Sequence, residues 1–235
     1  MARRGGRLAG LEARIGHGFA KPELVREALT HASLTGRSRR QPVRTNERLE
    51  FLGDRVLGLI VADLVIHRFP DEPEGSLTPR FHALVRKEAL AEIAGVLDLA
   101  SALRLAPGGD PANPAILADS CEALIGAIYL DGGLGAAEAF VHRHWSPRLE
   151  AMTEPPRDPK TELQEWAQGR GLTLPRYALV DTAGPDHAPV FEVEVAVSGF
   201  PPAKGRGASK RAAEQAAAAD LLRAVVPSAR AAEAR

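Results

Sequence analysis

Residues 46–57 read Asn-Glu-Arg-Leu-Glu-Phe-Leu-Gly-Asp-Arg-Val-Leu, a stretch in which three carboxylates interrupt an apolar helical pattern. With about 100° of rotation per residue, Glu50 and Asp54 fall within roughly 60° of Glu47, so the three side chains share one stripe of a helix. Asn46 is a residue type suited to the N-cap. The apolar pattern continues beyond this stretch, which predicts a central and mostly enclosed helix.

Two explanations of the acidic stripe are open. A solvated face with local ion pairs to Arg48 and Arg55 accounts for the stripe taken alone. However, Asp119 and Glu122 lie three residues apart at the head of a second apolar helix. Two helices that each lend an acidic pair to a shared space would form the oxygen-lined pocket that Mg²⁺ prefers. Such a site can activate a water and neutralise the charge of a phosphate.

The composition limits the classes of function. The chain has 235 residues, 45% of them hydrophobic, which is enough for two domains of ordinary size. The net charge is +0, so nucleic-acid binding must rest on local patches. The single cysteine, Cys121, excludes an intrachain disulfide, fits a reducing compartment and is expected to be buried. No apolar run approaches the ~20 residues of a membrane span, so we expect a soluble, cytoplasmic protein with no membrane partner.

A proline-rich stretch divides the chain. Residues 154–159 read Glu-Pro-Pro-Arg-Asp-Pro, and proline at this density favours an extended linker. The pattern beyond it predicts a helix over 161–169, strands over 176–181 and 190–197, a third strand near 199–204 followed by a glycine-rich segment at 205–207, and a helix over 209–225. The order α-β-β-β-α predicts a small sheet with both helices on one face.

These patterns define five expected segments: a disordered basic tail at 1–7, a first domain at 8–150, a linker at 151–158, a second domain at 159–226 and a disordered tail at 227–235. Between the two acidic motifs, the sequence predicts helices over 77–90 and 92–97. Arg80, Arg86 and Lys87 are expected to give this region a positive side, and Trp145 is expected to be a packing residue.

Four motifs of the first domain resemble the ribonuclease III catalytic domain. Residues 46–57 resemble the signature helix of that family, and residues 118–131, Ala-Asp-Ser-Cys-Glu-Ala-Leu-Ile-Gly-Ala-Ile-Tyr-Leu-Asp, resemble its second acidic motif. Ala28-Leu29-Thr30-His31 and Glu74-Gly75-Ser76-Leu77-Thr78 also match in kind and order. The resemblance covers roughly residues 8–150 and is specific because four separated motifs agree in sequence and spacing.

This resemblance implies an all-helical catalytic domain with four metal ligands, Glu50, Asp54, Asp119 and Glu122. Mg²⁺, with Mn²⁺ able to substitute, would assist an in-line attack on a phosphodiester of double-stranded RNA. The implied products carry 5′-phosphate and 3′-hydroxyl ends with 3′ overhangs. Asp54 and Glu122 are implied to carry the catalytic step, and the auxiliary residues are Glu47 and Glu74.

The family works as a homodimer in which each subunit cuts one strand. By resemblance, Phe51 packs across the dimer interface, and burial within its own subunit is the alternative. The chain departs from the commonest family pattern at Phe81 and His82, where a basic residue often follows the Leu-Thr motif. This departure leaves the selection of cleavage sites open.

The second domain, about residues 159–226, resembles a double-stranded-RNA-binding domain. The matching stretches are residues 161–166, the loop at 184–187 and residues 205–215. The resemblance implies that the domain reads A-form RNA by shape, across two successive minor grooves and the phosphates between them. The implied RNA-binding residues are Thr161, Gln164, Glu165 and Gln168 in one groove, His187 in the next, and Lys210 and Arg211 on phosphates.

The leading hypothesis is therefore a Mg²⁺-dependent endoribonuclease specific for double-stranded RNA. Its substrates would include ribosomal RNA precursor stems and structured mRNA and tRNA precursors. The alternative is a non-catalytic, dimeric scaffold that binds double-stranded RNA, but a scaffold could lose Asp54 or Glu122 without penalty, and both are present. A hydrolase for a small phosphate ester is disfavoured by the appended RNA-reading domain.

Overall fold

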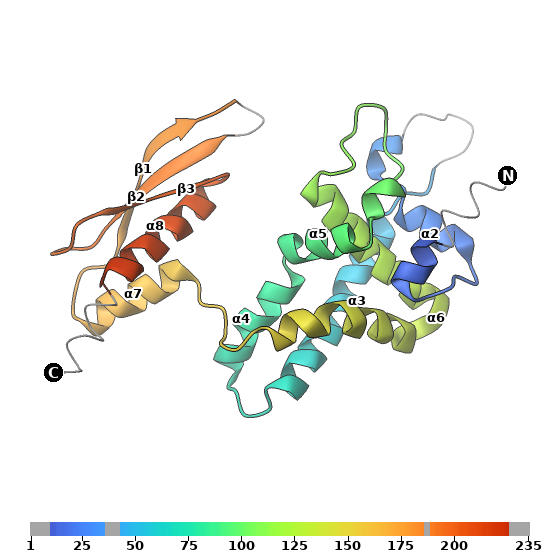
Figure 1. Cartoon of the computed structure of the whole chain (residues 1–235), viewed down its shortest axis with the longest axis horizontal. Helices are drawn as coiled ribbons and strands as arrows, with labels where there is room; N and C mark the ends of the chain where they lie inside the picture. Colours follow the sequence, from blue (N-terminus) through green and yellow to red (C-terminus); the bar gives the residue numbers. More distant parts are fainter. Residues whose placement is uncertain (1–9, 36–42, 186–188, 226–235) are drawn as a thin grey trace. The chain divides into compact units, whose positions relative to one another are not determined.

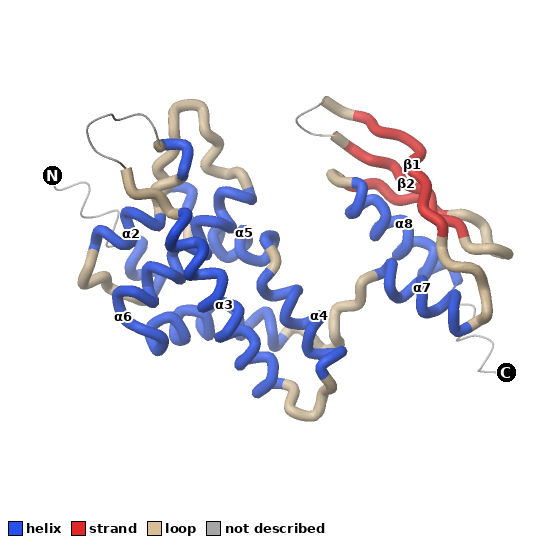
Figure 2. The backbone as a smooth tube through the Cα atoms, turned by 180° about the vertical axis from the view of Figure 1, so that it is seen from behind, coloured by secondary structure: helices blue, strands red, loops and turns tan. Residues whose placement is uncertain are grey.

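The computed structural model describes residues 10–35, 43–185 and 189–225. The chain divides into two compact units, unit 1 at residues 1–156 and unit 2 at residues 157–235. Within the described ranges, strands occur only in unit 2 (Figure 2). The predicted tails at 1–7 and 227–235 and the residue His187 lie outside the described residues.

Unit 1 is helical (Figure 1). Residues 10–15 form a helix that ends at Gly16, whose φ of +76° favours glycine. The elements that follow are α2 (Pro22–Ala28), η1 (Ala32–Leu34), α3 (Glu47–Arg68), α4 (Glu74–Val85), α5 (Lys87–Val96), η2 (Leu99–Ser101) and α6 (Pro114–Glu150).

The core of unit 1 lies between α3 and α6. Leu57 and Ile60 of α3 and Leu124 and Ile128 of α6 are all buried in one apolar cluster. The prediction of a central helix is confirmed for this face. The expectation that the helix is mostly enclosed is wrong, because its opposite face exposes large apolar residues including Phe51.

Helix α6 is long and apolar, and Gly133 interrupts it. The φ of +74° and ψ of −172° at Gly133 are not helical, so two helical pieces meet there at a kink. Of the helices that the structure describes, α6 is the one long and apolar enough to cross a membrane by length and composition. Its apolar residues serve the core of unit 1: Trp145 is buried, as expected of a packing residue, and its indole N–H donates to the Leu84 carbonyl at 2.9 Å.

The helices between the acidic motifs differ from the prediction. The chain breaks at Arg86, whose ψ of 154° is extended, so α4 ends at Val85 and α5 begins at Lys87. The sequence pattern missed this break because the apolar spacing runs across it without a proline or glycine. The expected helices over 77–90 and 92–97 are therefore wrong at their junction.

Arg80 does not contribute to a positive surface, contrary to the expectation. Its guanidinium is buried, donates to both carboxylate oxygens of Glu72 at 2.8 and 2.9 Å, and lies 3.6 Å from the centre of the Phe69 ring. It also donates to the carbonyl of Met152 at 2.7 Å. This side chain therefore anchors the segment that follows α6, at the start of the predicted linker.

Unit 2 has the predicted order of elements. They are α7 (Pro159–Gly169), β1 (Arg176–Ala183), β2 (Val190–Ala196), β3 (Ala203–Gly207) and α8 (Lys210–Val225). The three strands form one antiparallel sheet in the order β1-β2-β3, and both helices lie on the same face of it (Figures 1 and 2). The glycine-rich segment 205–207, expected to follow the third strand, is instead part of it.

Close packing explains why glycine is needed within β3. A Cβ atom on Gly205 would lie 2.1 Å from the backbone nitrogen of Ala217, so only glycine lets α8 approach β3 this closely. Ala213, Ala217 and Ala218 of α8 are fully buried at this contact side of the helix. These small side chains therefore let the helix pack closely against the sheet.

Candidate metal centre and RNA-binding surface

Two glycines let α3 and α6 cross in backbone contact. A Cβ atom at Gly53 would lie 1.7 Å from the carbonyl oxygen of Glu122, and one at Gly126 would lie 2.3 Å from the carbonyl oxygen of Leu49. Any larger residue at either position would push the helices apart. The crossing therefore fixes the distance between acidic residues on the two helices.

At this crossing, three carboxylates converge. Glu50 of α3 and Asp119 and Glu122 of α6 each offer an oxygen, and these atoms lie within 4.8 Å of one another. We call these three residues the acidic cluster. All three side chains are half-buried, and a set of carboxylate oxygens is the donor set that hard divalent cations prefer. The residues present therefore fit a divalent metal ion.

The acidic cluster concentrates negative charge. Burial, together with the charges of Asp54, Glu50 and Asp119, raises the pKa of Glu122 to about 7. Burial and the neighbouring Asp119 also raise the pKa of Glu50. Carboxyl groups that resist ionisation in each other's presence bind a cation favourably, since the cation removes their mutual repulsion.

Asp54 lies at the edge of the acidic cluster. It is exposed and paired with the guanidinium of Arg55, and it is not among the three residues whose oxygens converge. Its charge is nevertheless close enough to raise the pKa of Glu122. The structure therefore brings together three of the four predicted ligands and places the fourth beside them, held by the local ion pair that sequence reasoning had kept open.

Sequence reasoning missed the contact that Lys87 makes with the acidic cluster. Lys87, the first residue of α5, donates from its ammonium to Asp119 Oδ1 at 3.0 Å. From its sequence, Lys87 was expected only to lie on a positive side of its own region. The sequence held no signal for this contact, because the predicted helix over 77–90 had Lys87 in its interior and the partner lies 32 positions further along the chain.

The auxiliary residues make local contacts. Glu47 Oε2 accepts a hydrogen bond from the Thr45 hydroxyl at 2.9 Å, and Glu74 Oε1 accepts one from the Thr78 hydroxyl at 2.8 Å.

Asn46 does not cap α3 with its side chain, contrary to the expectation. Its φ of −65° and ψ of −19° are already helical, and the buried side chain makes no cap hydrogen bond.

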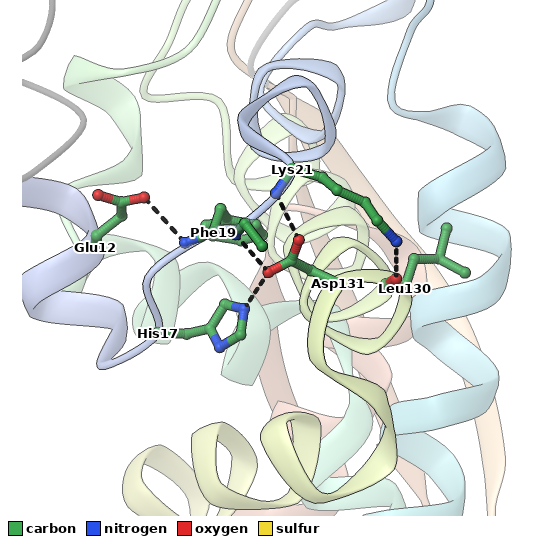
Figure 3. A network of polar contacts seen from close by, with 7 residues as sticks. Glu12, His17, Phe19, Lys21, Leu130 and Asp131 are labelled. Carbon is green, nitrogen blue, oxygen red and sulfur yellow. Dashed lines mark hydrogen bonds and ion pairs between the residues drawn. The ribbon is translucent and has the colours of Figure 1, made fainter.

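The end of the second acidic motif is structural. The Asp131 side chain is 2% exposed and accepts hydrogen bonds from the backbone N–H groups of Ala20 and Lys21, at 3.0 and 2.8 Å (Figure 3). Its Oδ2 also lies 2.8 Å from His17 Nε2. Asp131 therefore connects the segment before α2 to α6.

Cys121 lies between the two acidic residues of the same motif. It is fully buried, as expected.

One face of α3 carries an exposed apolar stripe. Phe51 is 65% exposed, and Leu59 and Ile66 of the same helix are also exposed. The alternative reading of Phe51, burial within its own subunit, is therefore wrong. Of the two positions that depart from the family pattern, Phe81 packs against the core of unit 1 and His82 is exposed.

Unit 2 presents to solvent those predicted RNA-binding residues that the structure describes. The side chains of Thr161, Gln164, Glu165 and Gln168 are exposed on α7, and Lys210 and Arg211 are exposed in the first turn of α8. Thr161, Gln164 and Arg211 line one open pocket of about 490 Å³. The two helices therefore contribute to one polar surface.

The comparisons with known proteins match both units. Residues 21–149 match a family model described as ribonuclease-III-like, and residues 159–225 match one described as a double-stranded RNA binding motif. The fold and the acidic cluster thus define a ribonuclease-III-like domain followed by a double-stranded-RNA-binding domain.

Relatives over nearly the full length agree with this classification. Ribonuclease 3 of Bradyrhizobium diazoefficiens is 49% identical over 91% of this chain and 87% of its own length, and that of Caulobacter vibrioides is 49% identical over 94% and 97%. The nuclease domain of ribonuclease III from Campylobacter jejuni is 35% identical, with a TM-score of 0.54 over 59% of this chain and 95% of that domain. The chain belongs to the ribonuclease III family.

Proposed function

We propose that this protein is an endoribonuclease that hydrolyses phosphodiester bonds in double-stranded RNA with the help of Mg²⁺. The observation that carries the proposal is the convergence of Glu50, Asp119 and Glu122 in a chain that also carries a double-stranded-RNA-binding domain. Carboxylate oxygens suit Mg²⁺, and Mn²⁺ is able to substitute for it. The proposed products have 5′-phosphate and 3′-hydroxyl ends with 3′ overhangs.

The four carboxylates of the proposed site have different roles. Glu50, Asp54, Asp119 and Glu122 would hold the metal ion, for which Asp54 has to leave its pair with Arg55. When bound, the ion activates a water for in-line attack and neutralises charge on the phosphate. Glu122 is the most buried of the proposed catalytic residues, so its charge acts most strongly on the reacting atoms, with Asp54 beside it.

RNA recognition belongs to unit 2 in this proposal. The exposed polar side chains of α7 would enter a minor groove, and Lys210 and Arg211 would hold phosphates at the start of α8. Such contacts read A-form shape rather than sequence. The substrates we propose are ribosomal RNA precursor stems and structured mRNA and tRNA precursors, in the cytoplasm.

The exposed stripe on α3 supports a homodimer. Phe51, Leu59 and Ile66 are apolar and solvent-exposed in the single chain, which is typical of a surface covered by a partner. The Campylobacter jejuni nuclease domain is described as having a region involved in dimer formation. We propose that the stripe packs against a second copy and that each subunit cuts one strand.

Cleavage of a perfect RNA duplex in the presence of Mg²⁺ tests the catalytic proposal. We expect short duplexes with 3′ overhangs from the wild type, and a loss of about 10³-fold in rate for Glu122→Gln, because glutamine keeps the size of the side chain but removes its charge. Glu138→Gln is the matched control, since Glu138 lies on α6 beyond the kink and is exposed.

Two results would count against the proposal. If the wild type binds duplex RNA tightly but does not cut it, the protein is the non-catalytic scaffold instead. If Glu122→Gln and Glu138→Gln cut equally well, the acidic cluster is not the catalytic centre.

A further inference from the structure

Lys87 is the basic residue that reaches into the acidic cluster. In the part of the chain that the structure describes, no other ion pair involves Glu50, Asp119 or Glu122. The Lys87 ammonium lies 3.0 Å from Asp119 Oδ1, and oxygens of Glu50 and Glu122 lie within 4.8 Å of an oxygen of Asp119. The basic side chain is therefore placed beside a group of three carboxylates.

The position of Lys87 in its helix points to a specific role. Lys87 is the first residue of α5, where the partial positive charge of the helix N-terminus disfavours a cation. The ordinary residue types of a first helical turn are acidic or neutral. The contact with Asp119 offsets this unfavourable placement, and it brings a positive charge to the three carboxylates of the acidic cluster.

We propose that Lys87 is the internal counter-cation of the acidic cluster: it holds Asp119 in the metal-free protein and competes with the divalent ion for that carboxylate. This inference rests on the proposed metal site. The Lys87 ammonium occupies one acceptor site of Asp119 Oδ1 at 3.0 Å and puts a positive charge beside the oxygens that would coordinate the ion. Because two cations repel each other at such short range, binding of the ion favours withdrawal of the ammonium.

Withdrawal of Lys87 is sterically easy. The Lys87 side chain is 66% exposed, whereas that of Asp119 is 23% exposed. The flexible four-carbon stem of lysine lets the ammonium move into solvent while the carboxylate stays in place. Lys87 thus stabilises the site without a metal ion and weakens the binding of one, which makes it a positioning residue for Asp119.

Thermal unfolding of the full chain in EDTA tests the counter-cation role. We expect Lys87→Gln to lower the melting temperature of unit 1 by about 2–4 °C, because the crowded carboxylates lose their cation. The transition of unit 2 serves as an internal reference in calorimetry. Arg86→Gln is the matched control, since it removes the same charge one residue earlier, where the partner of Arg86 is the exposed Glu88.

Titration with Mn²⁺, followed by the electron paramagnetic resonance signal of the free ion, tests the competition. We expect Lys87→Gln to bind Mn²⁺ about three- to tenfold more tightly than the wild type, whereas Lys87→Arg and Arg86→Gln stay close to it. A purely structural role of Lys87 would not strengthen metal binding. Unchanged or weaker Mn²⁺ binding by Lys87→Gln overturns the competition.

The same titration separates this inference from the proposed function. If Glu122→Gln binds Mn²⁺ as the wild type does, the proposed metal site is wrong and the competition falls with it. If Glu122→Gln loses binding but Lys87→Gln matches the wild type, the metal site stands and only the competition is wrong. The melting temperature in EDTA decides the counter-cation role in either case, and equal melting of Lys87→Gln and Arg86→Gln overturns it.

Discussion

At the scale of single residues, the chemistry of the site depends on how Glu122 carries its charge. Burial and three neighbouring carboxylates raise its pKa from the ordinary 4.5 to about 7. The folded protein therefore binds a proton at Glu122 at pH values where the unfolded chain has released it. The stability associated with this proton is fully present below about pH 4.5 and is lost as the pH rises through about 7.

This loss of stability with rising pH leads to a prediction for the metal-free protein. Glu122→Gln removes the unfavourable charge, so in EDTA we expect it to melt about 2–4 °C above the wild type at pH 8, and at the same temperature at pH 4.5. Thermal unfolding across this pH range, with Glu138→Gln as the control, is the measurement. A variant that melts below the wild type at pH 8 would contradict the assigned environment.

The sequence could predict most of the carboxylates that converge but not what they contact. It placed Glu50, Asp54, Asp119 and Glu122 in one site, and the structure brings together all of these except Asp54. One of these contacts was open in the sequence and one was beyond it. The pair of Asp54 with its neighbour Arg55 was one of the two explanations of the acidic stripe, whereas Lys87 reaches Asp119 from another helix. Side-chain rotamers and contacts between distant segments decide these pairings, and helical periodicity contains neither.

At the scale of elements, the site depends on the crossing of α3 and α6. Gly53 and Gly126 permit backbone contact there. Glu50 lies within one turn of Gly53, and Glu122 and Asp119 precede Gly126 by about one and two turns. The sequence predicted both helices from apolar periodicity. It missed the junction between α4 and α5, because Arg86 breaks the helix through its backbone conformation and not through a residue type that disfavours helix. Apolar spacing sets helix faces more reliably than helix ends.

We predict that Gly126→Ala separates the two helices. The new Cβ would meet the Leu49 carbonyl oxygen at 2.3 Å, so we expect a loss of about 1–3 kcal/mol in the free energy of unfolding and at least a ~10²-fold loss in cleavage rate. Chemical denaturation and duplex cleavage measure these effects.

Gly135→Ala on the same helix is the control for this substitution. A Cβ atom at Gly135 has no neighbour within 4 Å, so alanine there should leave cleavage intact. If Gly126→Ala behaves like Gly135→Ala, the helix crossing does not fix the geometry of the site.

The start of α8 offers a second test at this scale. Lys210 and Arg211 are exposed in its first turn, where they are placed to meet RNA phosphates. We expect the double variant Lys210→Gln, Arg211→Gln to weaken duplex binding and to reduce the salt dependence, the slope of log K against log salt, by about one for each lost phosphate contact. Arg223→Gln, in the last turn of α8, is the control. If the double variant and the wild type have equal salt slopes, the phosphate contacts lie elsewhere.

At the scale of the whole molecule, the order of the two units was readable from the sequence. Proline density marked the boundary near residues 154–159, and the change from helical to alternating periodicity separated a helical unit from one with a sheet. The exposed face of α3 was not readable in this way. Leu59 and Ile66 continue the apolar pattern of the buried face, and periodicity cannot tell a face covered by the chain itself from one left for a partner.

This exposed face leads to the last prediction, that α3 carries the dimer contact. Phe51 is 65% exposed, and the Arg55 guanidinium lies 4.2 Å from the centre of its ring, so this contact holds the exposed ring against its own helix. Removal of a central aromatic side chain from an interface costs about 2 kcal/mol, which is about 30-fold in the dissociation constant. We therefore expect Phe51→Ala to shift the protein from dimer to monomer at micromolar concentration in sedimentation equilibrium.

The matched control for Phe51→Ala is Val96→Ala. Val96 is 70% exposed at the end of α5, outside the stripe, so its truncation removes exposed apolar surface without touching the proposed contact. If both variants stay dimeric, the stripe is not the interface. If Phe51→Ala alone becomes monomeric and its cleavage of duplex RNA falls in proportion to the monomer fraction, the dimer is the active species, because each subunit then supplies one of the two sites that act on opposite strands.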